Sequence, residues 1–184
     1  MAIGEKRMTS ETFLAFAGQP QNAGRLLELV NGEIVEKVVS FVPSQIAGNI
    51  VFALKLYLRG TRLGRVTTAD GAYVISKTDV FIPDVAYISR ERLPERPPHE
   101  SPSPPDLAVE VRSHTDRKRD LRQKAERYLA GGTRLVWLVF PEEQVVEVHT
   151  PDADVLVESL SGTLSGDEVL PGFSLKVADI FADE

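Results

Sequence analysis

The sequence predicts an α/β fold, in which a mixed central β-sheet is flanked by helices and extended by additional β-hairpins. In the middle of the chain, helical and strand-like segments follow the order helix, three strands, helix, strand. The apolar segments 107–111 and 134–140 are joined through a helical segment, and such a crossover requires parallel strands. These strands are apolar on both faces, which is typical of a sheet covered by helices on both sides.

The first half of the chain is expected to begin with a short helix and a hairpin. Thr9 or Ser10 can cap the first helix and Gly18 can end it. The dipeptide Asn31-Gly32 is a strong hairpin signal between two apolar runs. The expected helices cover residues 10–18 and 44–59, and the expected strands cover residues 26–30, 33–39, 64–68, 72–76 and 80–89.

The second half begins with an irregular segment. Six of the twelve prolines fall between residues 94 and 105, which predicts an exposed, stiff loop. After it we expect a strand at 107–111, a helix at 116–130, a hairpin of 134–140 with 144–150, a strand at 155–160 and a C-terminal segment at 173–181. We predict one domain over residues 1–184, with its core at about 25–140 and C-terminal strands at 144–181.

Composition excludes several classes of protein and site. The chain has 184 residues and no cysteine, so disulfides, thiolate metal sites and cysteine nucleophiles are excluded. With three histidines, a histidine-rich zinc site is poorly supported. The N-terminal stretch lacks the pattern of a signal peptide, and no apolar run is long enough to span a bilayer. We therefore expect a cytoplasmic protein without a membrane partner.

Positive charge is concentrated in one part of an acidic chain. The net charge is −6, which argues against a surface that is basic throughout. Between residues 112 and 127, however, seven basic residues stand against three acidic ones. This stretch directly follows the strand at 107–111.

Two carboxylates stand in strands that are otherwise apolar. Asp84 lies within 80–89, and Glu110 lies within 107–111. A buried carboxylate must be paired, protonated or bound to a metal ion, because its desolvation costs several kcal/mol. A salt bridge, such as one with Arg112 on the same strand face, is one explanation. If the two strands are neighbours, a shared divalent cation is the other.

The helix expected after Glu110 carries a lysine at the edge of its buried face. At 100° per residue its apolar positions form one stripe, made of Leu121, Ala125, Tyr128 and Leu129. Lys124 flanks this stripe, so its amine can reach the end of the sheet. A solvated surface lysine is the alternative.

These features together resemble a known superfamily. Pro83-Asp84 and the strand ending in Glu110, within this order of elements, resemble the PD-(D/E)XK superfamily of restriction-endonuclease-like nucleases. Five ordered blocks are similar to the Uma-two family of restriction endonucleases, a domain of unknown function abundant in cyanobacteria. The blocks are LLELVNGEIVE, FIPDVAYIS, PDLAVEVRSHTD, DLRQKAERYLAGGTRLVWLVF and LPGFSLKVADIF, which run from about Ser10 to Phe181 with their flanks.

The resemblance implies a metal site and a catalytic lysine. Its metal ligands fall on Asp84 and Glu110, with the carbonyl of Val111 as a further oxygen, and the implied cofactor is Mg²⁺, with Mn²⁺ as a substitute. The superfamily lysine expected two residues after the glutamate is replaced by Arg112. In this family the lysine is taken to have moved to the following helix, which indicates Lys124.

The resemblance also suggests an early catalytic glutamate. Glu33 is the expected residue, and Glu28 is less favoured because it lies inside the strand before the turn. Many relatives carry a histidine near the start of the helix at 44–59, where this chain has Pro43, Ser44 and Gln45. Four arginines are expected to contact nucleic acid: Arg112, Arg117, Arg119 and Arg122.

The function implied is Mg²⁺-dependent hydrolysis of phosphodiester bonds by an endodeoxyribonuclease, with DNA as the expected partner and a homodimer as the expected assembly. An inactive binding or assembly module that keeps the nuclease fold is the alternative. A glycosidase with the same two carboxylates is weaker, because the chain is only 7% aromatic and Trp137 lies in an apolar strand.

Overall fold

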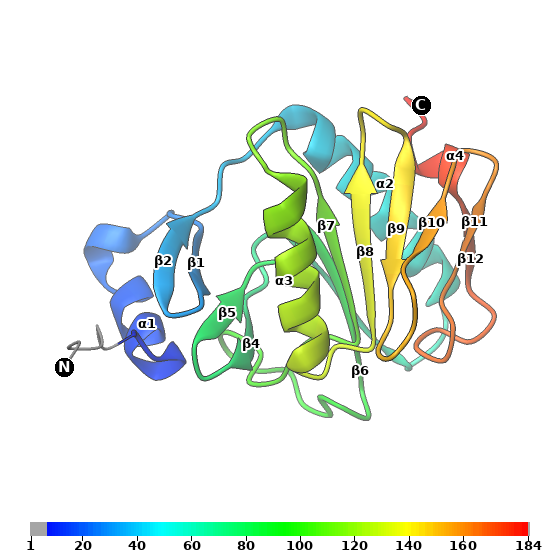
Figure 1. Cartoon of the computed structure of the whole chain (residues 1–184). Coiled ribbons are helices and arrows are strands. Elements are labelled where there is room, and N and C mark those ends of the chain that lie inside the picture. Colours follow the sequence, from blue (N-terminus) through cyan, green and yellow to red (C-terminus); the bar gives the residue numbers. More distant parts are fainter. Residues whose placement is uncertain (1–6, 184) are drawn as a thin grey trace.

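The computed structural model describes residues 7–183 as a mixed central sheet with a helix on each face and a smaller sheet beside it (Figure 1). The N-terminal residues 1–6 and Glu184, which belong to the predicted domain, lie outside the described residues. Six strands form the central sheet. In spatial order they are β10 (Leu156–Glu158), β9 (Val145–His149), β8 (Leu135–Phe140), β7 (Leu107–Val111), β6 (Val85–Ser89) and β3 (Gly64–Thr68).

Pairing in the central sheet confirms the predicted mixed α/β fold. Strands β7 and β8 are parallel, as the crossover predicts, and the remaining neighbours are antiparallel. Helix α2 (Phe41–Tyr57) covers one face and α3 (Lys118–Ala130) covers the other. Alternate residues of β7 therefore enter two different cores. Val109 packs with α2 in one core, and Ala108 packs with α3 in the other.

The smaller sheet lies beside α3 and carries the N-terminal helix (Figure 1). Its strands in spatial order are β2 (Glu33–Glu36), β1 (Leu27–Val30), β5 (Asp79–Phe81) and β4 (Tyr73–Ser76). The hairpin about Asn31-Gly32 is confirmed, and both turn residues have positive φ, 53° and 80°. Helix α1 (Ser10–Ala17) is capped by Thr9 as predicted, and it buries Phe13 against β1.

The prediction of one strand over residues 80–89 is wrong. The chain forms β5 in the small sheet, leaves it at Ile82, and enters the central sheet as β6. Pro83 has no N–H for a ladder, and the Ile82 N–H donates to Glu28 Oε1 at 2.6 Å instead of to a neighbouring strand. Asp84 is therefore held at the junction of the two sheets, next to the start of β6.

Other boundaries differ by a few residues or in type. Helix α2 begins at Phe41 rather than 44, and α3 begins at Lys118 rather than 116. The C-terminal region is not made of strands alone. It contains β11 (Thr163–Ser165), which the pattern missed, then β12 (Ser174–Lys176) and the helical turn α4 (Val177–Ile180). A 3₁₀ turn, η1 (Pro20–Asn22), follows α1.

The proline-rich segment 94–105 contains no helix or named strand, as predicted, although Ser101 makes an isolated bridge to Tyr73. Within residues 7–183 there is no helix both long and apolar enough to cross a bilayer.

Candidate active site

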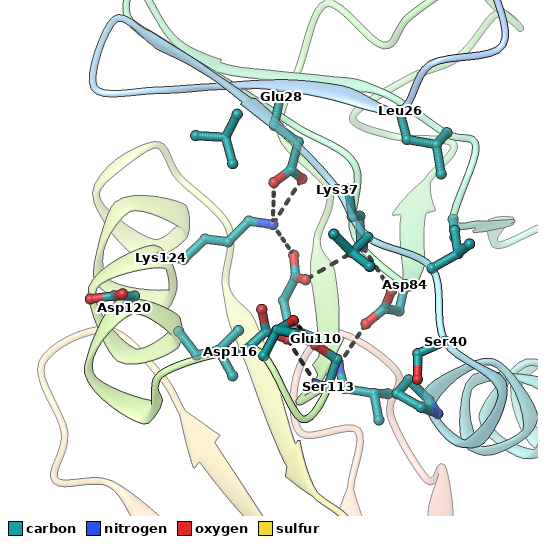
Figure 2. Close-up of a pocket in the computed structure, with 18 of the residues that line it drawn as sticks. Leu26, Glu28, Lys37, Ser40, Asp84, Glu110, Ser113, Asp116, Asp120 and Lys124 are labelled. Carbon is teal, nitrogen blue, oxygen red and sulfur yellow. Dashed lines mark hydrogen bonds and ion pairs between the residues drawn. The ribbon is translucent and has the colours of Figure 1, made fainter.

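A cleft of about 910 Å³ opens where the small sheet meets the central sheet. Its walls come from β1, from β2 and the segment after it, from the start of α2, from the end of β3, from Asp84 just before β6, from the end of β7, and from the first three turns of α3. Figure 2 shows Glu28, Lys37, Asp84, Glu110 and Lys124 pointing toward one another at its floor. Three carboxylates and two lysines from distant parts of the sequence thus meet in one cluster.

Asp84 and Glu110 are positioned by adjacent strands. Strands β6 and β7 are antiparallel neighbours, with Val85 opposite Val109, so Asp84 and Glu110 extend the same register. One Asp84 oxygen, Oδ2, accepts a hydrogen bond from the Val111 N–H at 2.7 Å. Glu110 is only 3% exposed, and its Oε1 accepts from the Tyr128 hydroxyl at 2.7 Å. The predicted proximity of the two acids is therefore present.

Lys124 reaches Glu110 from α3, as its position beside the buried stripe predicts. Its Nζ lies 2.8 Å from Glu110 Oε1, and it also donates to both oxygens of Glu28 at 2.8 and 2.9 Å. The same ammonium lies 5.1 Å from the centre of the Phe81 ring. With its side chain 12% exposed, Lys124 is held in the interior and is not a solvated surface lysine.

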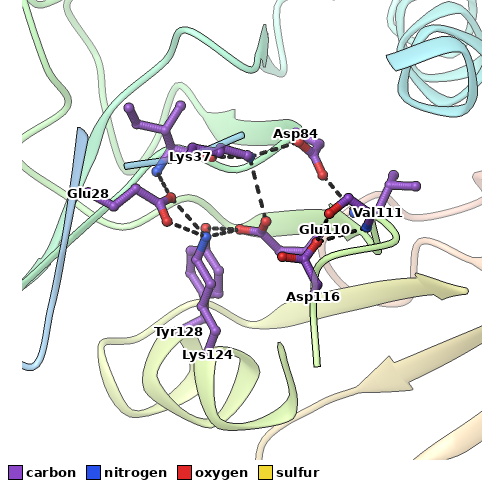
Figure 3. A network of polar contacts seen from close by, with 10 residues as sticks. Glu28, Lys37, Asp84, Glu110, Val111, Asp116, Lys124 and Tyr128 are labelled. Atoms are coloured by element: carbon purple, nitrogen blue, oxygen red, sulfur yellow. Dashed lines mark hydrogen bonds and ion pairs between the residues drawn. The ribbon is translucent and has the colours of Figure 1, made fainter. Parts of the chain in front are cut away.

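Lys37 is a member of the cluster that the sequence did not reveal. It follows β2, and its Nζ lies 2.7 Å from Asp84 Oδ1 and 3.7 Å from Glu110 Oε2 (Figure 3). It also donates to the carbonyl of Ile82 at 2.7 Å. In the sequence it sits in the run EIVEKVV, where nothing local distinguishes it from a surface lysine on a strand.

The two candidate early glutamates occupy different environments. Glu28 is buried in β1 and bonds to Lys124 and to the Ile82 N–H. Glu33 lies on the exposed strand β2, opposite Val30, at the margin of the cleft. The geometry favours Glu28 over Glu33 as the third acid of the site.

The ionisation of the two central acids follows from their surroundings. Burial raises the pKa of Asp84, and the charge of Glu110 raises it further, although Lys37 opposes both effects. Burial alone would raise the pKa of Glu110 as well, but Lys124 and Lys37 outweigh it, so this pKa lies below its ordinary value. Of the two acids, Asp84 is the one closer to taking up a proton.

The lysines and the tyrosine keep their protons. Burial disfavours the charged amines, but Glu110 with Asp84 raises the pKa of Lys37, and Glu110 with Glu28 raises the pKa of Lys124. Burial and the charge of Glu110 hold the pKa of Tyr128 well above its usual value, so its hydroxyl stays a donor.

The oxygen atoms of Asp84 and Glu110 are of the kind that suits a magnesium ion. Mg²⁺ commonly binds one or two carboxylates and keeps several waters. Among residues 7–183, no group of three or more histidine, cysteine, aspartate or glutamate side chains is gathered closely enough to enclose an ion by itself. The ammonium of Lys37, between the two carboxylates, marks a position that is electrostatically favourable for a cation. The residues therefore fit a water-rich Mg²⁺ site of two protein ligands.

The four arginines expected to contact nucleic acid are placed differently from one another. Arg117 lines the cleft at the start of α3. Arg112 is paired with Glu142 at 2.9 Å and also donates to the Asp116 carbonyl. Arg122 forms a two-oxygen contact with Glu147. Arg119 is exposed. Arg112, Arg119 and Arg122 do not line the cleft.

A mixed sheet with acids at the ends of two adjacent strands, and a lysine from the following helix, defines a restriction-endonuclease-like protein. The chain belongs to the Uma2 family, described as "Putative restriction endonuclease", whose model matches residues 10–178. A crystal structure of "a putative nuclease belonging to DUF820 from Anabaena variabilis" has the same fold, with a TM-score of 0.81 and 20% sequence identity. That match covers 95% of this chain and 97% of the other. No curated protein matches the chain.

Proposed function

We propose that this chain is a Mg²⁺-dependent endonuclease that hydrolyses phosphodiester bonds of DNA. The observation that carries the proposal is the cluster at the cleft floor, in which Asp84 and Glu110 lie on adjacent strands and Lys124 contacts Glu110. Membership of the Uma2 family, whose description is "Putative restriction endonuclease", supports the same activity.

The residues have distinct roles in this proposal. Asp84 and Glu110 would hold the metal ion, which when bound polarises the phosphate and lowers the pKa of a coordinated water. Glu28 holds the Lys124 ammonium from the side opposite Glu110 and so fixes its direction. Glu33 lies outside this cluster on an exposed strand, so its role would be limited to the rim of the cleft.

Lys124 would stabilise the negative charge that develops on the phosphate during attack. Its ammonium is charged, buried and fixed by two acids, so little reorganisation is needed when that charge appears. Arg112 is a poor candidate for proton transfer, because a guanidinium stays protonated in proteins. Arg112 is also paired with Glu142, and neither residue lines the cleft.

Binding of the DNA backbone is proposed for the basic part of α3. Arg117 is the best placed of the four arginines, because it lines the cleft. Exposed Arg119 can reach a phosphate at the surface, whereas Arg112 and Arg122 would first have to leave their glutamate partners. A homodimer and a cytoplasmic location stay predictions from the sequence.

An inactive binding module is a second candidate, and a specific observation favours it. Each acid of the cluster already has a cationic partner: Glu28 and Glu110 bond to Lys124, and Asp84 bonds to Lys37. Such pairing satisfies the buried charges without any metal ion. Cleavage assays separate the two candidates.

The test compares cleavage of a plasmid by the wild type, Lys124→Ala, Arg112→Lys and the control Lys55→Ala, whose lysine is exposed on α2. We expect Mg²⁺-dependent cutting by the wild type, a loss of about 10²–10³-fold in rate for Lys124→Ala, and near-normal rates for the other two.

If the wild type cuts no substrate with Mg²⁺ or Mn²⁺, the binding module is favoured, and the histidine missing near Pro43 is the first residue to restore. If Lys124→Ala cuts normally and Arg112→Lys does not, Arg112 takes the catalytic role.

A further inference from the structure

Lys37 lies where the proposed metal ion would have to bind. Its ammonium is 2.7 Å from Asp84 Oδ1 and 3.7 Å from Glu110 Oε2, so it bridges the two acids (Figure 3). Mg²⁺ binds carboxylate oxygens at about 2.0–2.1 Å. An ion held by both acids and an ammonium bridging the same oxygens would occupy overlapping space, so the two cannot be present together.

The charge of the cluster leads to the same conclusion. Three carboxylates and two ammonium groups leave a net charge of −1. A divalent ion added to this set would give +1 in a largely buried site, which is unfavourable in a medium of low dielectric. When the Lys37 ammonium is withdrawn, the remaining charge is −2, and a divalent ion neutralises it.

Lys37 can withdraw more easily than Lys124. It belongs to the segment 37–40, which joins β2 to α2 and has no regular structure, and its side chain is 18% exposed at the cleft. Its backbone N–H donates to the Leu26 carbonyl, so the main chain can stay in place while the four-carbon stem rotates. Lys37 makes one close contact to an acid, a longer one to Glu110 and one to the Ile82 carbonyl. Lys124 is fixed by a helix and by three close contacts to acids.

We propose that Lys37 is an internal cation that bridges Asp84 and Glu110, and that its ammonium has to move away from both acids before a divalent metal ion binds. The inference rests on the proposed function, because it assumes that these two acids are the metal ligands. It assigns Lys37 a role of its own: the lysine lowers the affinity for metal and keeps the site intact without it.

The experiment is a calorimetric titration of Mn²⁺ alone into the full chain, without nucleic acid. The variants are the wild type, Lys37→Met, Lys37→Arg and the surface control Lys55→Met. We expect Lys37→Met to bind Mn²⁺ at least tenfold more tightly than the wild type, because it keeps the stem and removes the charge. Lys37→Arg, which keeps the charge, and Lys55→Met should both bind as weakly as the wild type.

Thermal melting gives a second readout that also reports on folding. Without metal, Lys37→Met should melt at a lower temperature than the wild type, because Asp84 and Glu110 then face each other without the bridging ammonium. Mn²⁺ should raise the melting temperature of Lys37→Met by more than that of the wild type, through ligand-linked stability.

Three other results are distinguishable. If the wild type and Lys37→Met bind Mn²⁺ equally, Lys37 does not compete with the ion and the inference fails while the metal site stands. If Lys37→Met binds more weakly than the wild type, Lys37 supports the bound ion and the inference is reversed. If no variant takes up Mn²⁺, both the inference and the proposed metal-dependent function are overturned.

Discussion

Two buried acids lie at opposite ends of strand β7 and are satisfied in different ways. Asp106, directly before the strand, is 1% exposed and pairs with Arg92 at 3.0 Å and Arg134 at 3.1 Å. It also accepts a hydrogen bond from the Ser89 N–H at 2.7 Å. Glu110, near the other end, lies in a cluster where acids outnumber bases and lysines supply the positive charge.

This difference shows that burial alone does not identify a functional carboxylate. Asp106 lies outside the cleft and has two permanently charged arginine partners. Because Arg92 follows β6 and Arg134 precedes β8, Asp106 links the end of β6 to the start of β8. Glu110 faces the cleft, shares its partners with other acids and is bonded by lysines, whose single point charges can rearrange. The excess of acid and the type of base distinguish a site from a structural pair.

The largest effect is expected for Asp106→Asn. Removing this charge leaves Arg92 and Arg134 close together without their shared acid. Because both guanidinium groups are partly exposed to solvent, we expect a cost of about 2–3 kcal/mol, as for the loss of several hydrogen bonds to a charged group. Urea denaturation should show this loss in the free energy of unfolding, while the exposed control Asp154→Asn stays within about 0.5 kcal/mol of the wild type. The Mn²⁺ affinity of Asp106→Asn should stay normal below its melting temperature. A change in that affinity would show that the two ends of β7 are coupled.

A smaller loss of stability is expected for Glu110→Gln. Unlike Asp106→Asn, this substitution should weaken metal binding. Lys124 keeps its contact with Glu28 and Lys37 keeps its contact with Asp84, so no cation is left without an acid. We expect a cost of about 1–2 kcal/mol, as for the loss of hydrogen bonds to a charged group. Calorimetry should show Mn²⁺ binding weakened at least tenfold. Equal or greater destabilisation than in Asp106→Asn, together with unchanged Mn²⁺ affinity, would make Glu110 a structural acid like Asp106.

The sequence predicted the parts of the site that depend on local periodicity. Alternation in β7 placed Glu110 on one face, and helical spacing placed Lys124 beside the buried stripe of α3. The crossover between β7 and β8 predicted the parallel pair. These relations hold within single elements or between elements joined by one connection, so a short window of sequence contains them.

The missed parts depend on how the small sheet docks on the central sheet. Glu28 and Lys124 are separated by 96 residues, and Lys37 and Ile82 by 45. The dipeptides Pro83-Asp84 and Pro105-Asp106 look alike in sequence, yet one acid faces the cleft and the other bonds two arginines. No local pattern contains these contacts, because each joins residues that are far apart in the sequence.

The smallest effect is expected for Tyr128→Phe, which tests the neutral partner of Glu110. Asp106 has no such neutral side-chain partner among the contacts described for residues 7–183, whereas Glu110 Oε1 accepts both from the Tyr128 hydroxyl at 2.7 Å and from Lys124. The ring of Tyr128 packs edge-on against Phe81, and phenylalanine preserves that contact. The substitution therefore removes one hydrogen bond in a buried site, and urea denaturation should show a loss of about 1 kcal/mol.

The same substitution should also raise the pKa of Glu110 toward its ordinary value, because the Tyr128 hydroxyl donates a hydrogen bond that stabilises the ionised carboxylate. The stability that ionised Glu110 contributes is present above its unfolded-state pKa and is lost as the pH falls through its lowered folded-state pKa. In Tyr128→Phe this acid-side loss should therefore begin at a higher pH than in the wild type. If the free energy of unfolding falls at the same acidic pH in both proteins, Lys124 and Lys37 alone hold Glu110 ionised. The Tyr128 hydroxyl then contributes a hydrogen bond but does not affect the charge of Glu110.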